Sequence, residues 1–322
     1  MLSTSQQNSL KLFPEIEPFN NFYLPSNNMH EIYVEESGNP EGNPIIFIHG
    51  GPGGGCGTKQ RRFFDPNYYR IILFDQRGCG KSKPLGETQN NTTSDLINDM
   101  ESIRKYLKIK DWFLFGGSWG STLALAYAIK FPKLVKGLIL RGIFLSRPHE
   151  LEWFLNEVDQ FFPDLHGNLL SHDSSINKKN LVSQYSKLVF GDNQEAAKNA
   201  AVAWNQFEGS ILKLVPPENT EPSESVNFDF ELARAKVQLH YIQNQCFVDG
   251  EEILNKASIL KDKPIIIVQG RYDMVCPPKT AYELMKKLPT SDFIMVPDAG
   301  HSASEPGILS ALIGATEKFK SL

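Results

Sequence analysis

Residues 116–120 of this chain read Gly116-Gly117-Ser118-Trp119-Gly120. An apolar run at 112–115 precedes them, and a run rich in alanine and leucine follows at 121–130. This order predicts a strand, a sharp turn and a buried helix. At such a junction the glycines of a G-x-S-x-G pattern allow the tight packing and strained backbone that lift one serine hydroxyl above a sheet. Ser118 is therefore the candidate nucleophile, and the competing interpretation is a glycine-rich turn with an incidental serine.

The rest of the chain alternates between buried strands and amphipathic helices. Apolar or alternating runs predict further strands at 31–36, 44–49, 69–74, 134–140, 264–268 and 292–296. Helical spacing of apolar residues predicts helices at 93–107 and 279–288. Strands that alternate with helices indicate an α/β fold, with a mostly parallel sheet flanked by helices.

The alternation stops between residues 146 and 257. This stretch is polar and helix-like, carries several large aromatic residues, and contains no convincing buried strand. We interpret it as an inserted helical cap. The predicted organisation is a core domain formed by 1–145 and 258–322, with the cap at 146–257.

Composition excludes several classes of function. The chain has 322 residues, 41% hydrophobic and 22% charged, with a net charge of -4, so no basic surface is predicted for nucleic acid. The polar start lacks the pattern of a signal peptide and no run is long enough to span a membrane, so we expect a cytoplasmic protein without a membrane partner. The four cysteines form no C-x-x-C pair, which predicts free thiols and no metal site. The oligomeric state stays open.

Two later stretches supply the partners that a serine nucleophile needs. Asp273 follows the predicted strand at 264–268, and His301 follows the one at 292–296, so both lie at the sheet edge where sites of parallel sheets collect. A serine hydroxyl needs a neutral imidazole to take its proton, and the imidazole needs a carboxylate to fix its tautomer. The chain order Ser118, Asp273, His301 is that of the α/β-hydrolase layout.

A glycine-rich loop, 49–55, follows the buried strand at 44–49. An oxyanion hole needs uncrowded backbone N–H groups, one after the nucleophile and one from such a loop. We assign the N–H groups of Trp119 and Gly51. His49 is expected to have a structural hydrogen-bonding role, and Asp75 and Arg77 are expected to form a structural pair beside the site.

Across nearly its whole length the chain resembles the proline iminopeptidases, or prolyl aminopeptidases, of the α/β-hydrolase superfamily. The matching stretches are 49–55, 75–78, 116–125 (GGSWGSTLAL), 270–277 (GRYDMVCP) and 299–303. The resemblance implies a serine aminopeptidase that acts on peptides with a free N-terminal proline through an acyl-enzyme, with no metal and no cofactor.

An exopeptidase of this kind must hold a positively charged amino terminus, and a buried cation needs a carboxylate partner. Glu208 lies one helical turn after Trp204, so an aromatic wall and an anion are predicted on one helix face. The resemblance makes Glu208 the amine-binding residue, although a solvated surface glutamate is the alternative. Phe207 stands where the family usually has a second tryptophan. Gln238 stands where the family has a second glutamate, two positions before a His-Tyr pair, so one amine-binding charge is missing.

Two other functions remain open on the sequence. The missing glutamate favours an esterase or amidase for small acyl substrates on the same scaffold. The other alternative is a binding protein that has lost activity, and the full set of Ser118, Asp273 and His301 argues against it.

Overall fold

The computed structural model describes residues 9–27, 29–215 and 227–322. Eight strands form one sheet in the order β1-β2-β4-β3-β5-β6-β7-β8. Their bounds are β1 Asn20–Ser26, β2 His30–Gly38, β3 Asn43–Ile48, β4 Tyr69–Phe74, β5 Trp112–Ser118, β6 Val135–Ile143, β7 Ile265–Gly270 and β8 Asp292–Val296. The pairs β1–β2 and β2–β4 are antiparallel, and all other neighbours are parallel. The mostly parallel sheet predicted from the sequence is confirmed.

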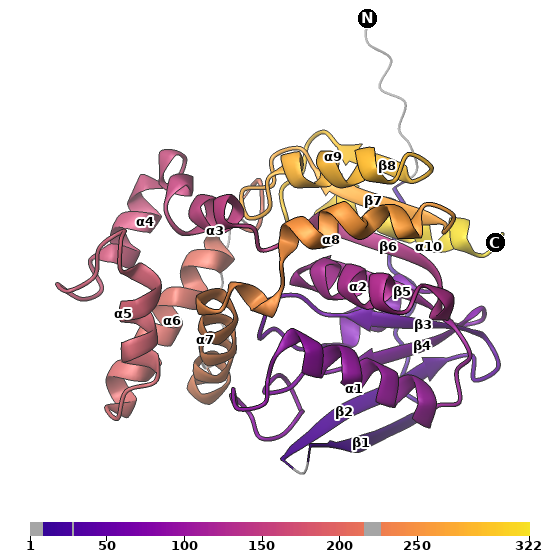
Figure 1. Cartoon of the computed structure of the whole chain (residues 1–322), viewed down its shortest axis with the longest axis horizontal. Coiled ribbons are helices and arrows are strands. Elements are labelled where there is room, and N and C mark those ends of the chain that lie inside the picture. The colour runs from indigo at the N-terminus through magenta and orange to yellow at the C-terminus, as the bar shows by residue number, and fades with distance from the viewer. Residues whose placement is uncertain (1–8, 28, 216–226) are drawn as a thin grey trace, which may run out of the picture.

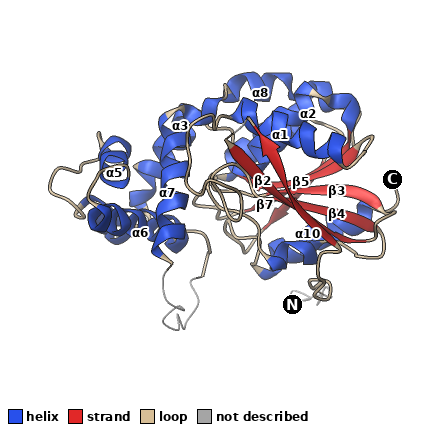
Figure 2. Ribbon diagram, turned by 90° about the horizontal axis from the view of Figure 1, so that it is seen from below, coloured by secondary structure: helices blue, strands red, loops and turns tan. Residues whose placement is uncertain are grey.

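Helices cover both faces of this sheet (Figure 2). Those of the core are α1 Thr93–Tyr106, α2 Trp119–Lys130, α8 Gly250–Lys256, α9 Pro278–Lys287 and α10 Pro306–Phe319. Helices α1, α2 and α8 lie on one face and α10 lies on the other. Short 3-10 turns occur at η1 Thr58–Phe63, η2 Pro132–Leu134, η3 Glu157–Gln160, η4 Gln245–Phe247 and η5 Ala257–Leu260.

Helix α1 shows how local sequence sets an element of the core. Thr92 accepts a hydrogen bond from the backbone N–H of Asp95 at 3.3 Å, and the Asp95 carboxylate accepts one from the Thr92 N–H at 3.0 Å. This capping box satisfies two N–H groups that the first turn leaves unpaired. The buried face of α1, including Leu96, Met100 and Ile103, then packs against the core.

A group of helices stands to one side of the sheet (Figure 1). They are α3 Pro148–Leu155, α4 Pro163–Leu170, α5 Leu181–Val189, α6 Gln194–Ser210 and α7 Phe228–Gln243. They enclose an apolar cluster of their own, which also takes in Val275 and Cys276 from the loop after β7. Within the described ranges, the structure has no helix that is both long and apolar enough to cross a bilayer.

The last helix of the predicted cap packs elsewhere. Ile253 and Leu254 of α8 lie in the apolar cluster on the face of the sheet that α1 and α2 cover, together with residues of those two helices. We therefore propose that the cap ends near the end of α7, and that α8 is a core helix that covers the sheet.

Candidate active site

Ser118 is the last residue of β5, the strand between β3 and β6, and α2 begins at the next residue. Its backbone has φ +58° and ψ -130°, a conformation that L-residues rarely adopt and that costs on the order of 1–3 kcal/mol. A Cβ on Gly116 would lie 2.3 Å from the carbonyl oxygen of Gly120, and a Cβ on Gly120 would lie 2.1 Å from that of Ile48. Both glycines are therefore needed for the close approach of strand and helix, and the predicted elbow is present.

Asp273 and His301 meet beside this turn. The Nδ1 atom of His301 lies 2.7 Å from Oδ2 of Asp273. The other carboxylate oxygen, Oδ1, accepts backbone N–H groups from Val275 at 3.0 Å and Cys276 at 2.7 Å. The carboxylate is thus fixed in place, and it holds the imidazole with its proton on Nδ1 and its Nε2 available as an acceptor.

Nε2 of His301 faces Arg141, a residue that the sequence analysis did not single out. Arg141 Nη1 lies 2.9 Å from this nitrogen and also donates to the His301 carbonyl oxygen at 2.8 Å. Burial lowers the pKa of the guanidinium, and the nearby Asp273 opposes that effect. In the described part of the chain the Ser118 hydroxyl makes no hydrogen bond to the imidazole. Arg141 lies in β6 within a mostly apolar run, so the sequence pattern indicates a buried strand and gives no signal for a site residue there.

A buried network of hydrogen bonds connects the glycine loop to the start of α2. The His49 Nε2 atom accepts the backbone N–H of Gln76 at 3.0 Å, and the Gln76 amide donates to the His49 carbonyl oxygen at 2.9 Å. The indole N–H of Trp119 donates to Oε1 of Gln76 at 2.8 Å. Burial lowers the pKa of His49, although the Asp75 charge raises it. His49 has the structural hydrogen bonds that we expected, and Gln76 joins the loop before Gly51 to Trp119.

The backbone N–H of Trp119 is a suitable oxyanion donor because of its place in the chain. It is the first residue of α2, where N–H groups lack helical partners and the helix dipole favours negative charge. Gly51 has φ +117° in the facing loop and lines the same cavity as Ser118. The two assigned N–H groups therefore come from the two segments that flank the serine.

The pairing predicted between Asp75 and Arg77 is wrong. Asp75 instead accepts backbone N–H groups from Cys56 at 2.6 Å and Lys81 at 2.8 Å. Arg77 is buried and pairs with Asp99 of α1 at 2.7 Å. Because each side chain binds a different segment, Asp75 orders the loops on both sides of it and Arg77 anchors α1.

A cavity joins Ser118 to the helices beside the sheet. It is lined by Gly51, Ser118, Glu208 and Gln238, together with an apolar wall from Phe144, Leu151, Phe154, Ile242 and Val275. The candidate nucleophile, a glycine loop and a buried carboxylate from α6 thus face one small space. Such a mixture of apolar wall and few polar groups is typical of a ligand site.

The polar end of this cavity consists of a chain of hydrogen bonds. The Gln238 amide donates to Oε2 of Glu208 at 3.0 Å and accepts the indole N–H of Trp204 at 2.6 Å. Arg234 Nη2 also contacts Oε2 of Glu208, at 2.8 Å. Glu208 is therefore a buried residue and not a solvated surface glutamate. Trp204 lies behind Gln238 and does not line the cavity, so Phe144 and Phe154 form the aromatic wall.

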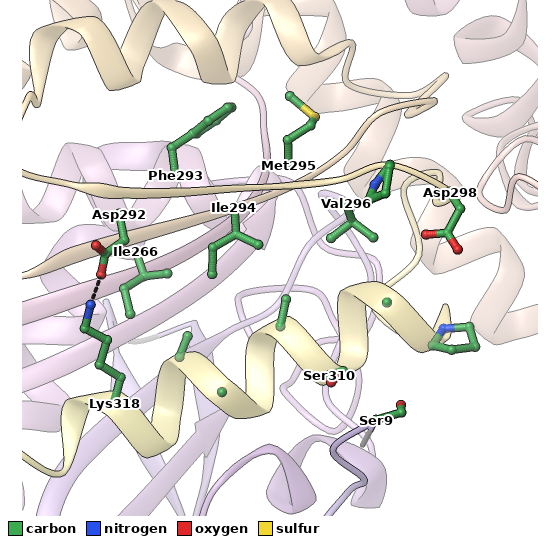
Figure 3. Close-up of a pocket in the computed structure, with 16 residues that line it drawn as sticks. Ser9, Ile266, Asp292, Phe293, Ile294, Met295, Val296, Asp298, Ser310 and Lys318 are labelled. Atoms are coloured by element: carbon green, nitrogen blue, oxygen red, sulfur yellow. Dashed lines mark hydrogen bonds and ion pairs between the residues drawn. The ribbon is translucent and has the colours of Figure 1, made fainter. Parts of the chain in front are cut away.

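A second, larger groove lies between β8 and α10, away from Ser118. Figure 3 shows Ile294 and Val296 directed toward α10, with Asp292 paired to Lys318 at one end. Apart from this ion pair its lining is mainly apolar or small, and it holds none of the residues predicted for catalysis.

The four cysteines are free thiols, as predicted. Cys276 is buried and lines the cavity with Ser118. Burial raises the pKa of its thiol well above the ordinary value, so it stays protonated at neutral pH.

Comparison with known proteins gives matches over almost the entire chain. A family profile described as the alpha/beta hydrolase fold matches residues 43–307. A probable proline iminopeptidase from Leptolyngbya boryana is 45% identical and covers 96% of this chain and 97% of its own length. A proline iminopeptidase from Arabidopsis thaliana is 43% identical and covers 98% of this chain and 83% of its own length.

Solved structures agree on the fold. A structure reported among epoxide hydrolases of the alpha/beta hydrolase superfamily, from metagenomes of hot environments, superposes with a TM-score of 0.63. It is 19% identical and the match covers 94% of this chain and 99% of that one. Because this scaffold carries more than one chemistry, activity has to be argued from the residues of the site.

Proposed function

Because this chain belongs to the proline iminopeptidase family of α/β-hydrolases, we propose that it releases an N-terminal proline from peptides by serine catalysis. The observation that carries the proposal is the single cavity shared by Ser118, Gly51 and Glu208. An exopeptidase needs a nucleophile at a fixed distance from a group that holds the free amine, and this cavity supplies both.

The acylation step uses the three residues at the sheet edge. Ser118 Oγ attacks the carbonyl carbon of the N-terminal residue while Nε2 of His301 takes the hydroxyl proton. Asp273 stabilises the imidazolium that forms. The N–H groups of Trp119 and Gly51 stabilise the negative charge that develops on the carbonyl oxygen. The imidazolium then gives its proton to the leaving nitrogen, the scissile C–N bond breaks, and the shortened peptide leaves.

Deacylation repeats the same steps with water. His301 takes a proton from a water molecule, whose oxygen attacks the ester carbon of the prolyl-enzyme. The ester C–O bond breaks, His301 returns the proton to Ser118, and free proline departs. No redox change occurs, and every proton that leaves a nucleophile reaches a leaving group through one imidazole.

Both steps require Nε2 of His301 to face the serine. Arg141 donates to that nitrogen at 2.9 Å in the structure, so this contact has to open before proton transfer. The bond from Arg141 to the His301 carbonyl oxygen can remain while it does, which keeps the histidine loop in place.

The amine end of the substrate lies toward Glu208. Its carboxylate oxygen Oε2 already accepts from Gln238 and Arg234, which leaves Oε1 for the substrate's ammonium group. A charge-assisted hydrogen bond there is about twice as strong as a neutral one. The apolar wall of Phe144, Leu151 and Phe154 accommodates the pyrrolidine ring.

Hydrolysis of prolyl p-nitroanilide tests the proposal. Purified protein should release p-nitroaniline from the prolyl compound and fail to release it from the N-acetylprolyl compound, because only an aminopeptidase requires a free amine. The neighbouring ion pair of Arg234 with Glu208 favours a second candidate, an esterase or amidase for neutral acyl groups. Equal cleavage of the two anilides would support that second candidate instead.

A further inference from the structure

The two carboxylate oxygens of Glu208 differ in their contacts. Both Arg234 Nη2, at 2.8 Å, and Gln238 Nε2, at 3.0 Å, contact the same oxygen, Oε2. Gln238 cannot rotate its own oxygen into the cavity at no cost, because that oxygen accepts the buried indole N–H of Trp204 at 2.6 Å. The only acceptor atom that this cluster offers an incoming ammonium is therefore Oε1 of Glu208.

The charges at this end of the cavity cancel. Among the described residues that line it, Glu208 is the one charged side chain, and the guanidinium of Arg234 neutralises it. The Glu208 side chain is 7% exposed and that of Arg234 is 25% exposed, so the pair is only weakly screened by water. A cationic substrate entering this space meets one positive and one negative group, and gains less than it would from an unpaired carboxylate.

We propose that Arg234 is a specificity-determining residue that neutralises Glu208 and so limits how strongly the site prefers a charged amino terminus over a neutral group of the same shape. The proposal deepens the proposed function and rests on it, since it concerns the same amine site. It predicts that this enzyme discriminates weakly between prolyl substrates and their uncharged isosteres.

The contacts of Arg234 explain why it can tune binding without being part of the catalytic machinery. Its ion pair with Glu208 is the one ion pair it makes within the described ranges. Its Nε atom is buried there with no hydrogen-bond partner. Its backbone carbonyl packs on the glycine loop, where a Cβ on Gly53 would lie 2.6 Å away, but this backbone contact does not depend on the side chain.

The experiment compares two p-nitroanilides that differ by one ring atom. Prolyl p-nitroanilide carries a ring ammonium, and tetrahydrofuran-2-carbonyl p-nitroanilide carries an ether oxygen at the same place. Their ratio of kcat/KM measures recognition of the ring ammonium, that is, of its charge and its N–H donors together. In Arg234→Met, which keeps much of the side-chain length and removes the charge, this ratio should rise about tenfold, as for one strengthened charge-assisted hydrogen bond.

Three further variants decide whether the effect passes through Glu208. Arg234→Lys retains the charge and should keep the wild-type ratio. Arg234→Gln can still donate a hydrogen bond to Glu208 but carries no charge. Its ratio should therefore also rise, and this variant replaces Arg234→Met in the comparison if the methionine variant folds poorly. When Glu208→Gln is already present, Arg234→Met should raise the ratio by less than it does in the wild type, because the carboxylate that Arg234 neutralises is gone.

The outcomes separate this proposal from the proposed function. An unchanged ratio in both neutral variants, with prolyl hydrolysis intact, overturns the role of Arg234 and leaves the aminopeptidase standing. Absence of prolyl hydrolysis in the wild type and in every Arg234 variant, with the tetrahydrofuran compound cleaved, overturns both. A gain of prolyl hydrolysis only in Arg234→Met and Arg234→Gln supports the role of Arg234 and shows that the wild-type enzyme acts on neutral acyl groups.

Discussion

Arg141 Nη1 lies 2.9 Å from Nε2 of His301, and the same nitrogen of Arg141 lies 2.8 Å from the His301 carbonyl oxygen. One arginine thus holds both the backbone carbonyl and the Nε2 nitrogen of the histidine. In the proposed mechanism Nε2 accepts the proton of Ser118, so Arg141 and Ser118 compete for one acceptor.

This competition predicts a change when Ser118 is covalently modified. In a crystal structure of the protein inhibited by a small fluorophosphonate, Nε2 of His301 should lie about 2.6–3.2 Å from Oγ of Ser118. The contact from Arg141 to Nε2 should be absent, and the contact to the His301 carbonyl oxygen should remain. If Arg141 still occupies Nε2 in the adduct, His301 is not the base that serves Ser118.

The nucleophile is tested by substitution. Ser118→Ala should lower kcat for prolyl p-nitroanilide by at least about 10³-fold, because the acyl-enzyme can no longer form. Its melting temperature should stay close to that of the wild type. Ser304→Ala, which changes an exposed serine in the histidine loop, is the matched control and should keep full activity. More than a few percent residual activity in purified Ser118→Ala would point to another nucleophile.

The buried strands of the core could be predicted from sequence because burial on both faces requires continuous apolar runs. Strands β4 and β8 were predicted at their observed bounds, 69–74 and 292–296, and β3, β6 and β7 within a few residues. Strand β1 was missed because it is an edge strand whose residues alternate between exposed and half-buried positions. Helix α10 was also missed, since a helix with a broad apolar face resembles a buried strand over short windows.

The residues of the candidate site likewise fall into those that the order of strands and helices predicts and those that it does not. Ser118, Asp273 and His301 follow strands, and the carboxyl ends of parallel strands meet at one edge, so their proximity follows from the order of elements. The partners of Glu208 could not be predicted in this way. Arg234 and Gln238 reach it across the α6–α7 contact, and their register depends on how two helices pack, which periodicity alone does not specify.

Gln76 should affect catalysis more than binding. It joins the His49 carbonyl to the Trp119 indole, and so links the two segments that carry the assigned oxyanion donors. Gln76→Met has similar volume but leaves both partners unpaired, and kcat should fall roughly 10-fold or more, with KM changed less than about twofold. Steady-state kinetics measure both parameters. A rise in KM with kcat unchanged would place Gln76 outside the oxyanion network.

Acid stability should depend on Glu101. Burial raises the pKa of this carboxyl, but hydrogen bonds from Arg104 and Tyr127 outweigh burial and hold it below its ordinary value of 4.5. Because the folded value is the lower one, the contribution to stability is complete above the unfolded pKa and is lost as the pH falls through the folded pKa.

We therefore expect Glu101→Gln to lower Tm by about 2–4 °C at pH 7 and by less below pH 4. Thermal unfolding followed between pH 3 and pH 7 gives the comparison, with Glu41→Gln, on an exposed turn, as control. A difference in Tm that stays constant over this range would show that the Glu101 charge does not contribute.

The last prediction concerns Gln238, whose amide donates to Glu208 at 3.0 Å. Gln238→Glu replaces this donor with a second carboxylate, and two adjacent carboxylates that share the single Arg234 cation repel each other while no substrate is bound. A substrate ammonium relieves the repulsion and gains a second charged acceptor. KM for prolyl p-nitroanilide should therefore fall severalfold at pH 8, with kcat changed less and the tetrahydrofuran compound unaffected.

At pH 6 the gain from Gln238→Glu should be smaller, because protons then compete with the substrate for the carboxylate pair. Gln243→Glu adds the same charge at the exposed end of α7 and controls for a general change in potential. If Gln238→Glu leaves KM unchanged at both pH values while Glu208→Gln raises it, the amine of the substrate contacts Glu208 alone and position 238 lies outside its reach.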